Sequence, residues 1–466
     1  MRLQTLLVTA ALMPLGWQCL AASPRATEDY VRVPMPAGVQ VINTELEGNV
    51  FADANGHTLY NWPLKPMRVG EAGDPANKTN CTNQVLREEG GHMSPYPPGL
   101  LLPDLDTRLS CAQMWPPLLA DKDAKPVGNW TIVARDDGTR QWAYAQQPLY
   151  TFKYDRMPGD TIGGTKRDMK PGVSARPAVR NPVGPPPNTP PGFDVLSTVN
   201  GRLLVGANTA LRPALYTFDK DTATKTACTS EDCLREWKPV LAPELARPTS
   251  KEWALMERSP GVRQWVFRGK PLYTHIPDLP FRGHGMSLDG SDVPGWRPVY
   301  TQTTPEPPGE LKRQATIGGD VLADGRGRTI YIYFCQDDAD DQLTCDHPET
   351  SQVTRLALCG AGDAARCLKR FPLVLASAGA QSTSRAWSVR DYNPMTGRFA
   401  QPGDKGAVRI WTYRDRPLYT FDGDPPPKVG DREPGDVEAD GLGQWHGQRD
   451  GYFAFWLRDD FYGRNN

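Results

Sequence analysis

Apolar and aromatic residues lie in short segments along this chain, and residues that favour turns bound each segment. The segments 130–133 and 141–144 flank Asp136-Asp137-Gly138, and the segment 58–62 follows Asn55-Gly56. Asp-Gly and Asn-Gly between two apolar runs are typical of β-hairpins. The pattern therefore predicts a mainly β fold with few helices.

One phrase, Trp-x5-Pro-Leu-Tyr-Thr, occurs three times, beginning at Trp142, Trp265 and Trp411. Upstream of each copy, a Cys is followed four residues later by an aromatic residue. These anchors are Cys111/Trp115, Cys233/Trp237 and Cys367/Phe371. Both spacings are kept while the intervening residues vary, which indicates three tandem copies of one β module.

The length of 466 residues also suits about three domains. We expect a signal peptide at 1–21 and a first module at 36–168, followed by a second module at 194–302 and a third at 312–466. The Pro-rich segments 169–193 and 303–311 are expected to be a linker and a spacer, because such segments favour an extended backbone. In module 3 the interval from Trp387 to Trp411 is twelve residues longer than its counterparts, which predicts a longer hairpin turn near 393–397.

Charge and composition narrow the class of protein. The formal net charge is −1, so no overall positive charge favours nucleic acid or an anionic membrane as a partner. The 46 Pro and 44 Gly residues favour turns over helices. We therefore expect no nucleic-acid partner. For an exported protein, which the N-terminus indicates below, the expected partner is an unknown envelope component or extracellular ligand.

The N-terminus resembles an export signal. Arg2 precedes a mostly apolar stretch at 3–15, and cleavage is expected after Ala21 or Ala22. Lipid anchoring through Cys19 is disfavoured because Gln18 is bulky where lipoprotein processing needs a small residue. No later segment reaches the roughly 20 apolar residues of a membrane span. The expected location is the periplasm or the extracellular space.

Cleavage would leave eight cysteines, an even number that suggests disulfides in an exported protein. The repeats indicate one pair in each module and an extra pair in module 3. The expected pairs are Cys81–Cys111, Cys228–Cys233, Cys359–Cys367 and Cys335–Cys345. A zinc site would need closely spaced Cys residues with His residues nearby, and the sequence has no such group. No metal or other cofactor is therefore expected.

The Leu-Tyr-Thr phrases extend into a second motif, Tyr-x-aromatic-x-x-Asp. Complete copies are Tyr150/Phe152/Asp155, Tyr216/Phe218/Asp221 and Tyr419/Phe421/Asp424. A fourth copy, Tyr273/His275/Asp278, has His in the aromatic position. Partial copies begin at Tyr60, where Lys65 replaces the acid, and at Tyr331, where Gln336 does. Each module thus resembles a pair of related half-repeats.

These motifs, with the Cys-x3-aromatic anchors and the Pro-Leu-Tyr phrases, resemble the bacterial secreted-repeat lipoprotein family, which has no assigned function. The resemblance extends over nearly the whole exported chain. It implies an exported repeat protein of the cell envelope. Two features differ from the family: Cys19 is a poor lipidation site, and members are typically short.

Two interpretations of the motif remain open. Tyr and the aromatic residue two positions later share one face of a strand, which suits a packed aromatic layer, and the Asp would accept backbone N–H bonds in a turn. Alternatively, the aromatic and Asp side chains form a cleft for a carbohydrate. Calcium at 337–341 or 289–292 is disfavoured because neither segment has a known calcium-loop spacing.

Signals for catalysis are weak. None of the six His residues recurs in all three modules, and there is no Gly-x-Ser-x-Gly motif. His284 and Met286 offer copper ligands, but a plain loop is favoured there. The two catalytic carboxylates of a glycosidase have no characteristic spacing in a sequence, so the sequence does not exclude them. The residues that repeat here are aromatics and cysteines, which are typical of a structural scaffold. We expect a non-enzymatic binding or envelope-interaction protein; the alternatives are a carbohydrate-binding protein and a copper- or redox-associated envelope protein.

Overall fold

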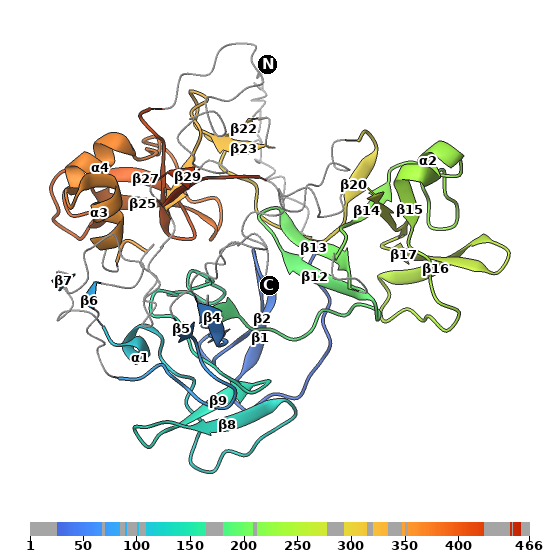
Figure 1. Ribbon diagram of the computed structural model, residues 1–466, viewed down its shortest axis with the longest axis horizontal. Helices are drawn as coiled ribbons and strands as arrows, with labels where there is room; N and C mark the ends of the chain where they lie inside the picture. The colour runs from blue at the N-terminus through green and yellow to red at the C-terminus, as the bar shows by residue number, and fades with distance from the viewer. Residues whose placement is uncertain are drawn as a thin grey trace, which may run out of the picture.

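The computed structural model describes residues 26–67, 70–83, 89–90, 100–101, 109–164, 180–207, 212–276, 293–314, 320–333, 347–349, 353–423, 448–449 and 451–457. These residues form antiparallel sheets of two to four strands, one sheet of seven strands and a few short helices, so the predicted mainly β fold is confirmed. Figure 1 shows three lobes around a common centre, one for each module.

Each module contains two hairpins. The first hairpins are β1–β2 (Gln40–Thr44, Gly48–Ala52), β12–β13 (Phe193–Ser197, Gly201–Gly206) and β22–β23 (Lys312–Gln314, Val321–Ala323). The second hairpins are β8–β9 (Trp130–Ala134, Arg140–Tyr144), β16–β17 (Trp253–Ser259, Val262–Phe267) and β25–β27 (Trp387–Asn393, Val408–Tyr413). In modules 1 and 2 the first hairpin lies toward the centre of the molecule and the second toward the periphery (Figure 1).

A short strand, or for Tyr150 an isolated bridge, carries the motif Tyr after each hairpin. In module 2 these strands are β14 (Leu215–Phe218) and β19 (Tyr273–His275), and Tyr216 lies opposite Tyr273. In module 3, β24 (Tyr331–Tyr333) and β28 (Arg416–Tyr419) place Tyr331 opposite Tyr419. In module 1, Tyr60 of β3 (Tyr60–Asn61) pairs with Tyr150. The six motifs therefore meet as three antiparallel pairs.

The two halves of a module exchange their last strands. In module 2, β15 (Trp237–Pro239) follows the first half but pairs with β19 of the second, and β20 (Trp296–Pro298) pairs with β14 of the first. The resulting sheet has the order β15-β19-β14-β20. Because each half completes the sheet of the other, neither can form its sheet alone.

The segment expected to be a linker differs from that expectation. Residues Asn181–Pro182 form β11, which pairs with β3 and occupies the place of β20 in module 2. Val183 continues the pairing, since its N–H donates to Leu59 O. The described part of this segment therefore closes the sheet of module 1. Proline has no backbone N–H to donate, and an edge strand tolerates it because the N–H positions on its outer side need no partner strand.

The Cys-x3-aromatic anchors form one helical turn each. In α1 (Cys111–Met114), α2 (Glu231–Glu236) and α4 (Ala364–Arg370), the N–H of the following aromatic residue donates to the carbonyl of the anchor Cys. An i→i+4 bond of this kind explains the constant spacing. The helix N-termini are capped by Ser110, Ser230 and Asp363.

The remaining elements are short. They are α3 (Val353–Gly360), β4 (Lys65–Met67), β5 (Gly70–Ala72), β6 (Glu89–Gly90), β7 (Leu100–Leu101), β10 (Gln147–Pro148), β18 (Lys270–Pro271), β21 (Tyr300–Thr303), β26 (Arg398–Phe399), β29 (Gln448–Arg449) and β30 (Tyr452–Ala454). Among the described residues, no helix combines the length and apolar character needed to cross a membrane.

The three modules pack against one another. Leu46 and Val199, from the turns of the first hairpins of modules 1 and 2, are buried in a core of module 3 that contains Trp387 and Trp411. The carboxylate of Glu47 accepts hydrogen bonds from Ser197 of module 2 and from Arg414 of module 3. Contacts between all three modules thus fix their arrangement.

Candidate functional site

Three of the motif Tyr residues, Tyr60, Tyr150 and Tyr273, donate hydrogen bonds to buried carboxylates. Tyr60 donates to Asp155 (2.6 Å) and Tyr273 donates to Asp221 (2.7 Å). In both cases the Tyr belongs to one half-repeat and the Asp to the other. The motif therefore joins the two halves of a module inside the core.

Tyr150 donates to Asp74 (2.6 Å), a residue that lies outside the sequence motif. The hairpin β4–β5 is inserted after Tyr60, so the acid expected at Lys65 is displaced to position 74. Asp74 lies seven residues before Cys81, as Asp221 lies seven before Cys228. That spacing was the available sequence signal, and the distance from Tyr60 concealed it.

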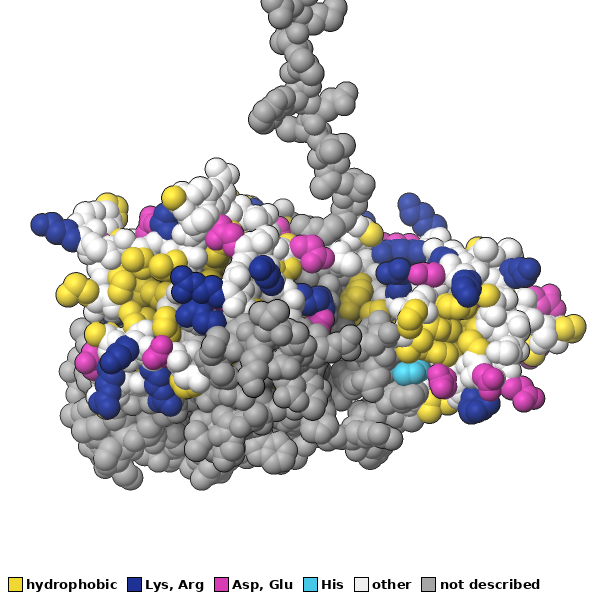
Figure 2. Space-filling view, turned by 90° about the horizontal axis from the view of Figure 1, so that it is seen from above, with side chains coloured by type: hydrophobic (Ala, Val, Ile, Leu, Met, Phe, Trp, Pro, Cys, Tyr) yellow, Lys and Arg dark blue, Asp and Glu magenta, His cyan; other side chains and the backbone are white. Residues whose placement is uncertain are grey.

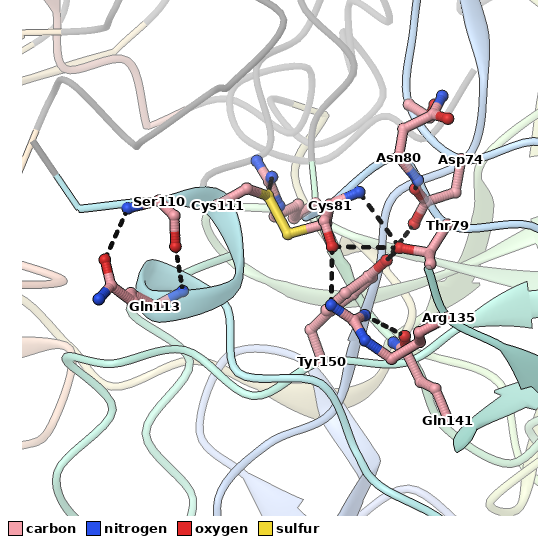
Figure 3. Close-up of a disulfide and its surroundings, with 12 residues drawn as sticks. Asp74, Thr79, Asn80, Cys81, Ser110, Cys111, Gln113, Arg135, Gln141 and Tyr150 are labelled. Atoms are coloured by element: carbon pink, nitrogen blue, oxygen red, sulfur yellow. Dashed lines mark hydrogen bonds between the residues drawn. A yellow bond between two sulfur atoms is a disulfide. The ribbon is translucent and has the colours of Figure 1, made fainter. Parts of the chain in front are cut away.

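Asp74 and Asp221 have equivalent surroundings. Asp74 Oδ1 accepts from the Asn80 N–H (2.7 Å), while Thr79 Oγ1 lies 2.6 Å from the Tyr150 hydroxyl and accepts from the Cys81 N–H. In module 2 the matching contacts are Ala227 N–H to Asp221 (2.6 Å), Thr226 to Tyr273 (2.5 Å) and Cys228 N–H to Thr226 (3.2 Å). Figure 3 shows the module 1 network beside its disulfide.

An Arg–Gln pair extends this network. Arg135 donates to Cys81 O (3.0 Å) and to Gln141 Oε1 (2.6 Å), and Gln141 donates to Leu149 O (2.8 Å), as Figure 3 shows in part. Arg258 and Gln264 make the same contacts in module 2. Neither pair was identified from the sequence, although each Gln directly precedes a repeat Trp.

Burial controls the ionisation of these groups. Burial raises the pKa of Asp74 to about 6, although hydrogen bonds from Tyr150 and the Asn80 N–H oppose the shift. Burial also raises the pKa of Asp155 well above its ordinary value. The pKa values of Tyr60, Tyr150 and Tyr273 are raised, first by burial and then by their Asp partners. These groups lie inside the protein, away from a substrate in solution.

Residues at the second aromatic position of the motif pack in the core, and Phe152 and His275 pack directly on the anchor aromatics Trp115 and Trp237. Trp237 stacks on Trp296 with ring centroids 3.7 Å apart, and His275 stacks on the other side of Trp237 at 4.3 Å. Phe218 stacks on Trp296 at 4.5 Å. In module 1, Phe152 packs on Trp115 at 4.5 Å. In module 2, His275, Trp237, Trp296 and Phe218 thus form one stack of rings in contact with one another.

In module 3 the Arg–Gln pair of this network is replaced. Tyr419 is buried, as is Arg355, which donates to the hydroxyl of Tyr452 (3.2 Å). Ile410 and Tyr392 stand where modules 1 and 2 have the Gln and Arg of the network. Phe421 is partly buried against this core.

Two motif acids, Asp278 and Asp424, lie outside the described residues. The expected pair Cys335–Cys345, the expected signal peptide at 1–21 and the acidic segments 289–292 and 337–341 also lie outside the described residues. The structure contains the disulfides Cys81–Cys111, Cys228–Cys233 and Cys359–Cys367.

The repeat Trp residues do not form an exposed surface for sugar stacking. Trp142, Trp265 and Trp411 are 7%, 3% and 2% exposed, respectively. They pack in the cores of their own modules. The aromatic cleft of the carbohydrate hypothesis therefore does not exist at these three positions.

Within the described ranges, no three His, Cys, Asp or Glu side chains are grouped as a metal site would require. His57 contacts one acid, Asp53, at 3.0 Å. The cleft between modules 1 and 3, lined by Glu45, Asp160 and Arg385 among others, holds about 10 Å³ of water-accessible space. That is about the room for one water molecule.

One apolar surface position recurs in all three modules. Leu119, Leu241 and Leu375 each lie four residues after the anchor aromatic and are 55%, 52% and 61% exposed. Each is paired by an isolated bridge with the second hairpin. We call these three residues the leucine positions. Figure 2 shows apolar side chains on the described part of one face, among charges of both signs.

An Arg two residues before each repeat Trp holds the loop that follows each leucine position. Arg140 donates to Asp121 O, Lys122 O and Ala124 O, and Arg263 donates to Pro243 O and Glu244 O. Arg409 donates to Ala378 O and Ala380 O (both 2.7 Å). The repeat phrase is therefore Arg-x-Trp-x5-Pro-Leu-Tyr-Thr, and its Arg orders a surface loop.

Together, the fold and the buried motif define a mainly β, disulfide-containing repeat protein. A family model described as a secreted repeat of unknown function matches residues 131–167. This segment contains β9, Trp142 and the Tyr150/Phe152/Asp155 motif. No curated protein and no solved structure matches the chain.

Proposed function

We propose that this protein is an exported, non-enzymatic binding protein that attaches to a component of the cell envelope or to an extracellular ligand. The observation that carries the proposal is the exposed leucine at the same position of three modules. Single exposed apolar residues are ordinary, but recurrence in equivalent, Arg-ordered loops indicates a shared use.

The chemistry of the core supports a role without catalysis. The described motif acids Asp155 and Asp221 are buried and occupied by Tyr and backbone donors. A catalytic acid or base must come within hydrogen-bond reach of its substrate. Asp155 and Asp221 instead connect the two halves of a module.

The packed arrangement of modules supports multivalent binding. Contacts through Glu47 and through the core around Trp387 hold the modules together, so the leucine positions keep fixed separations. Sites held in one body raise the effective local concentration for a second contact. A repetitive or multi-copy partner would benefit most.

Export is part of the proposal. The match to a secreted-repeat model and the signal-like N-terminus both support an extracellular or envelope location. The three disulfides support an oxidising compartment. We place the protein in the periplasm or outside the cell.

The test is site-specific photo-crosslinking in cells that export the protein. Benzoylphenylalanine at Leu119, Leu241 or Leu375 should yield the same discrete adduct from each position. Met395, which is 86% exposed but has no equivalent in modules 1 and 2, is the control and should not yield it. Replacing all three leucines by Ser should remove binding without lowering the melting temperature; no adduct at any leucine position would refute the proposal.

A further inference from the structure

The second hairpin of each module has one strand edge that faces away from its partner strand. In module 2, Arg268 N–H donates to Glu252 O, so Glu252 directs its backbone groups toward the partner strand. Along β16, every second residue after Glu252 does the same in the register with β17. In an antiparallel ladder, alternate residues direct their N–H and C=O groups away from the partner. Leu255 and Glu257 are therefore the outward residues of β16.

The same alternation applies to the other two modules. Ala145 N–H donates to Asn129 O in module 1, which makes Ile132 and Ala134 the outward residues of β8. Arg414 N–H donates to Ala386 O in module 3, so its outward residues include Val389 and Asp391 of β25.

Module 3 covers this edge with its own chain. Val389 N–H donates to Ser382 Oγ (3.0 Å), and Asp391 O accepts from Ala400 N–H (2.8 Å). Strand β26 pairs with the end of β25. It belongs to the residues that lengthen module 3 between Trp387 and Trp411. The extra residues thus act as an additional strand.

In modules 1 and 2 the described residues leave the equivalent edge open. Among the described residues, none bonds to the outward backbone groups of Ile132 and Ala134 in β8 or of Leu255 and Glu257 in β16. Strand β8 has the sequence Trp-Thr-Ile-Val-Ala, with no charged residue or Pro and an unbroken register. Proteins usually protect edges with charges, Pro or bulges, and β8 has none of them.

We propose that the open edges of β8 and β16 bind an extended polypeptide segment of the partner, which adds to each sheet as one further strand. This inference rests on the proposed binding function and specifies its partner as a chain with an accessible extended segment. The structure itself supplies the precedent, because β26 and Ser382 occupy the same edge in module 3. Backbone pairing of this kind gives affinity with little dependence on sequence.

In the bound partner segment, the residue at the position that Phe399 occupies in module 3 should be polar. Phe399 packs with Tyr392 and Ile410 in module 3. At the two equivalent positions module 1 has Arg135 and Gln141, and module 2 has Arg258 and Gln264. A short polar side chain suits those surroundings better than an aromatic ring.

A defined peptide tests the edge directly. The probe is a synthetic peptide with Ser in place of Phe in the sequence of residues 396–402, added at millimolar concentration to the full chain. Amide exchange at Ile132 and Leu255 should slow at least about fivefold, while exchange at Val389 stays unchanged. The same peptide with N-methylated backbone amides is the control and should give no protection. Equal effects of the two peptides, or no protection, would overturn the inference.

Crosslinking separates this inference from the proposed function. Benzoylphenylalanine at Ala134 or Glu257, both exposed beside the open edges, should yield the adduct seen at the leucine positions. The matched, also exposed Asp391 beside the covered edge should not. Ile132→Pro and Leu255→Pro remove one outward N–H each and should weaken binding at least about tenfold, as should Ala134→Lys if a Pro variant fails to fold. Adducts at the leucine positions with none at 134 or 257 would reject strand addition and leave the binding function standing.

Discussion

Glu47 accepts a hydrogen bond of 2.5 Å from Arg414, a residue 367 positions away along the chain. The pair is buried at the contact between modules 1 and 3, and Ser197 of module 2 donates to the same carboxylate. Burial alone would lower the pKa of Arg414, but the charge of Glu47 outweighs it and holds that pKa above its ordinary value. One side chain thus connects all three modules.

Glu47→Gln should therefore loosen the contacts between modules. Removing one partner of a buried ion pair typically costs about 3–5 kcal/mol, because the remaining charge is left without compensation. We expect calorimetry to show an earlier first transition and small-angle scattering to show a larger radius of gyration. Arg235→Ala is the control, since its ion pair with Asp232 is exposed on α2. An unchanged transition in Glu47→Gln would contradict the role given to this residue.

Asp74 should make stability depend on pH between about 4 and 6. Its folded pKa is raised from 3.8 to about 6, so the folded state holds the proton more tightly than the unfolded state. The associated stability is present below pH 4 and is lost as the pH rises through 6. A shift of this size corresponds to about 3 kcal/mol. Urea unfolding at several pH values should show a smaller loss of stability between pH 4 and 6 in Asp74→Asn than in the wild type, because the variant retains only the contribution of other buried acids such as Asp155.

Tyr150→Phe provides the matching variant. The Tyr150 hydroxyl lowers the pKa of Asp74, so its removal should raise that pKa further. The pH-dependent loss of stability should then extend to higher pH than in the wild type. If the loss of stability instead moved to lower pH, that result would contradict the hydrogen bond from Tyr150 to Asp74.

The disulfides should differ in strength. Cys81 and Cys111 are 30 residues apart, whereas Cys228 and Cys233 are 5 apart. Chain entropy predicts stabilisation of about 4 kcal/mol for the longer loop and about 2 kcal/mol for the shorter. Replacing both Cys residues of each pair by Ala and measuring unfolding in urea tests the order. A larger loss from the short loop would show that entropy of the unfolded chain is not the main contribution.

Ile410→Gln should destabilise module 3, although Gln occupies the same position in modules 1 and 2. Gln141 and Gln264 are satisfied by an Arg and a carbonyl, but module 3 has Tyr392 in place of the Arg. Burying an amide without its partners costs about 1–3 kcal/mol. Ile410→Leu is the control and should cost less than about 1.5 kcal/mol. Thermal unfolding followed by near-ultraviolet circular dichroism would detect the difference.

Local spacing predicted part of this fold. Asp-Gly between apolar runs indicated the hairpin that became β8–β9, because a tight turn depends on adjacent residues. Asp74 was missed because the inserted β4–β5 hairpin separates it from Tyr60, and its contact with Tyr150 spans 76 residues. The strand at 181–182 is not recognisable in the sequence, because its Pro-rich surroundings predict a linker and hide the pairing with β3.

The sequence alone determined the repeated phrase, its three copies and the β character, since these depend on residue order and on the two-residue period of a strand. It also showed that an aromatic and an acid recur together. Only the tertiary structure decided that Tyr60 meets Asp155 from the other half-repeat, that the last strands are exchanged, and that Glu47 joins three modules. Those contacts join residues far apart in the chain, and the gain from burying them arises only when the whole module closes.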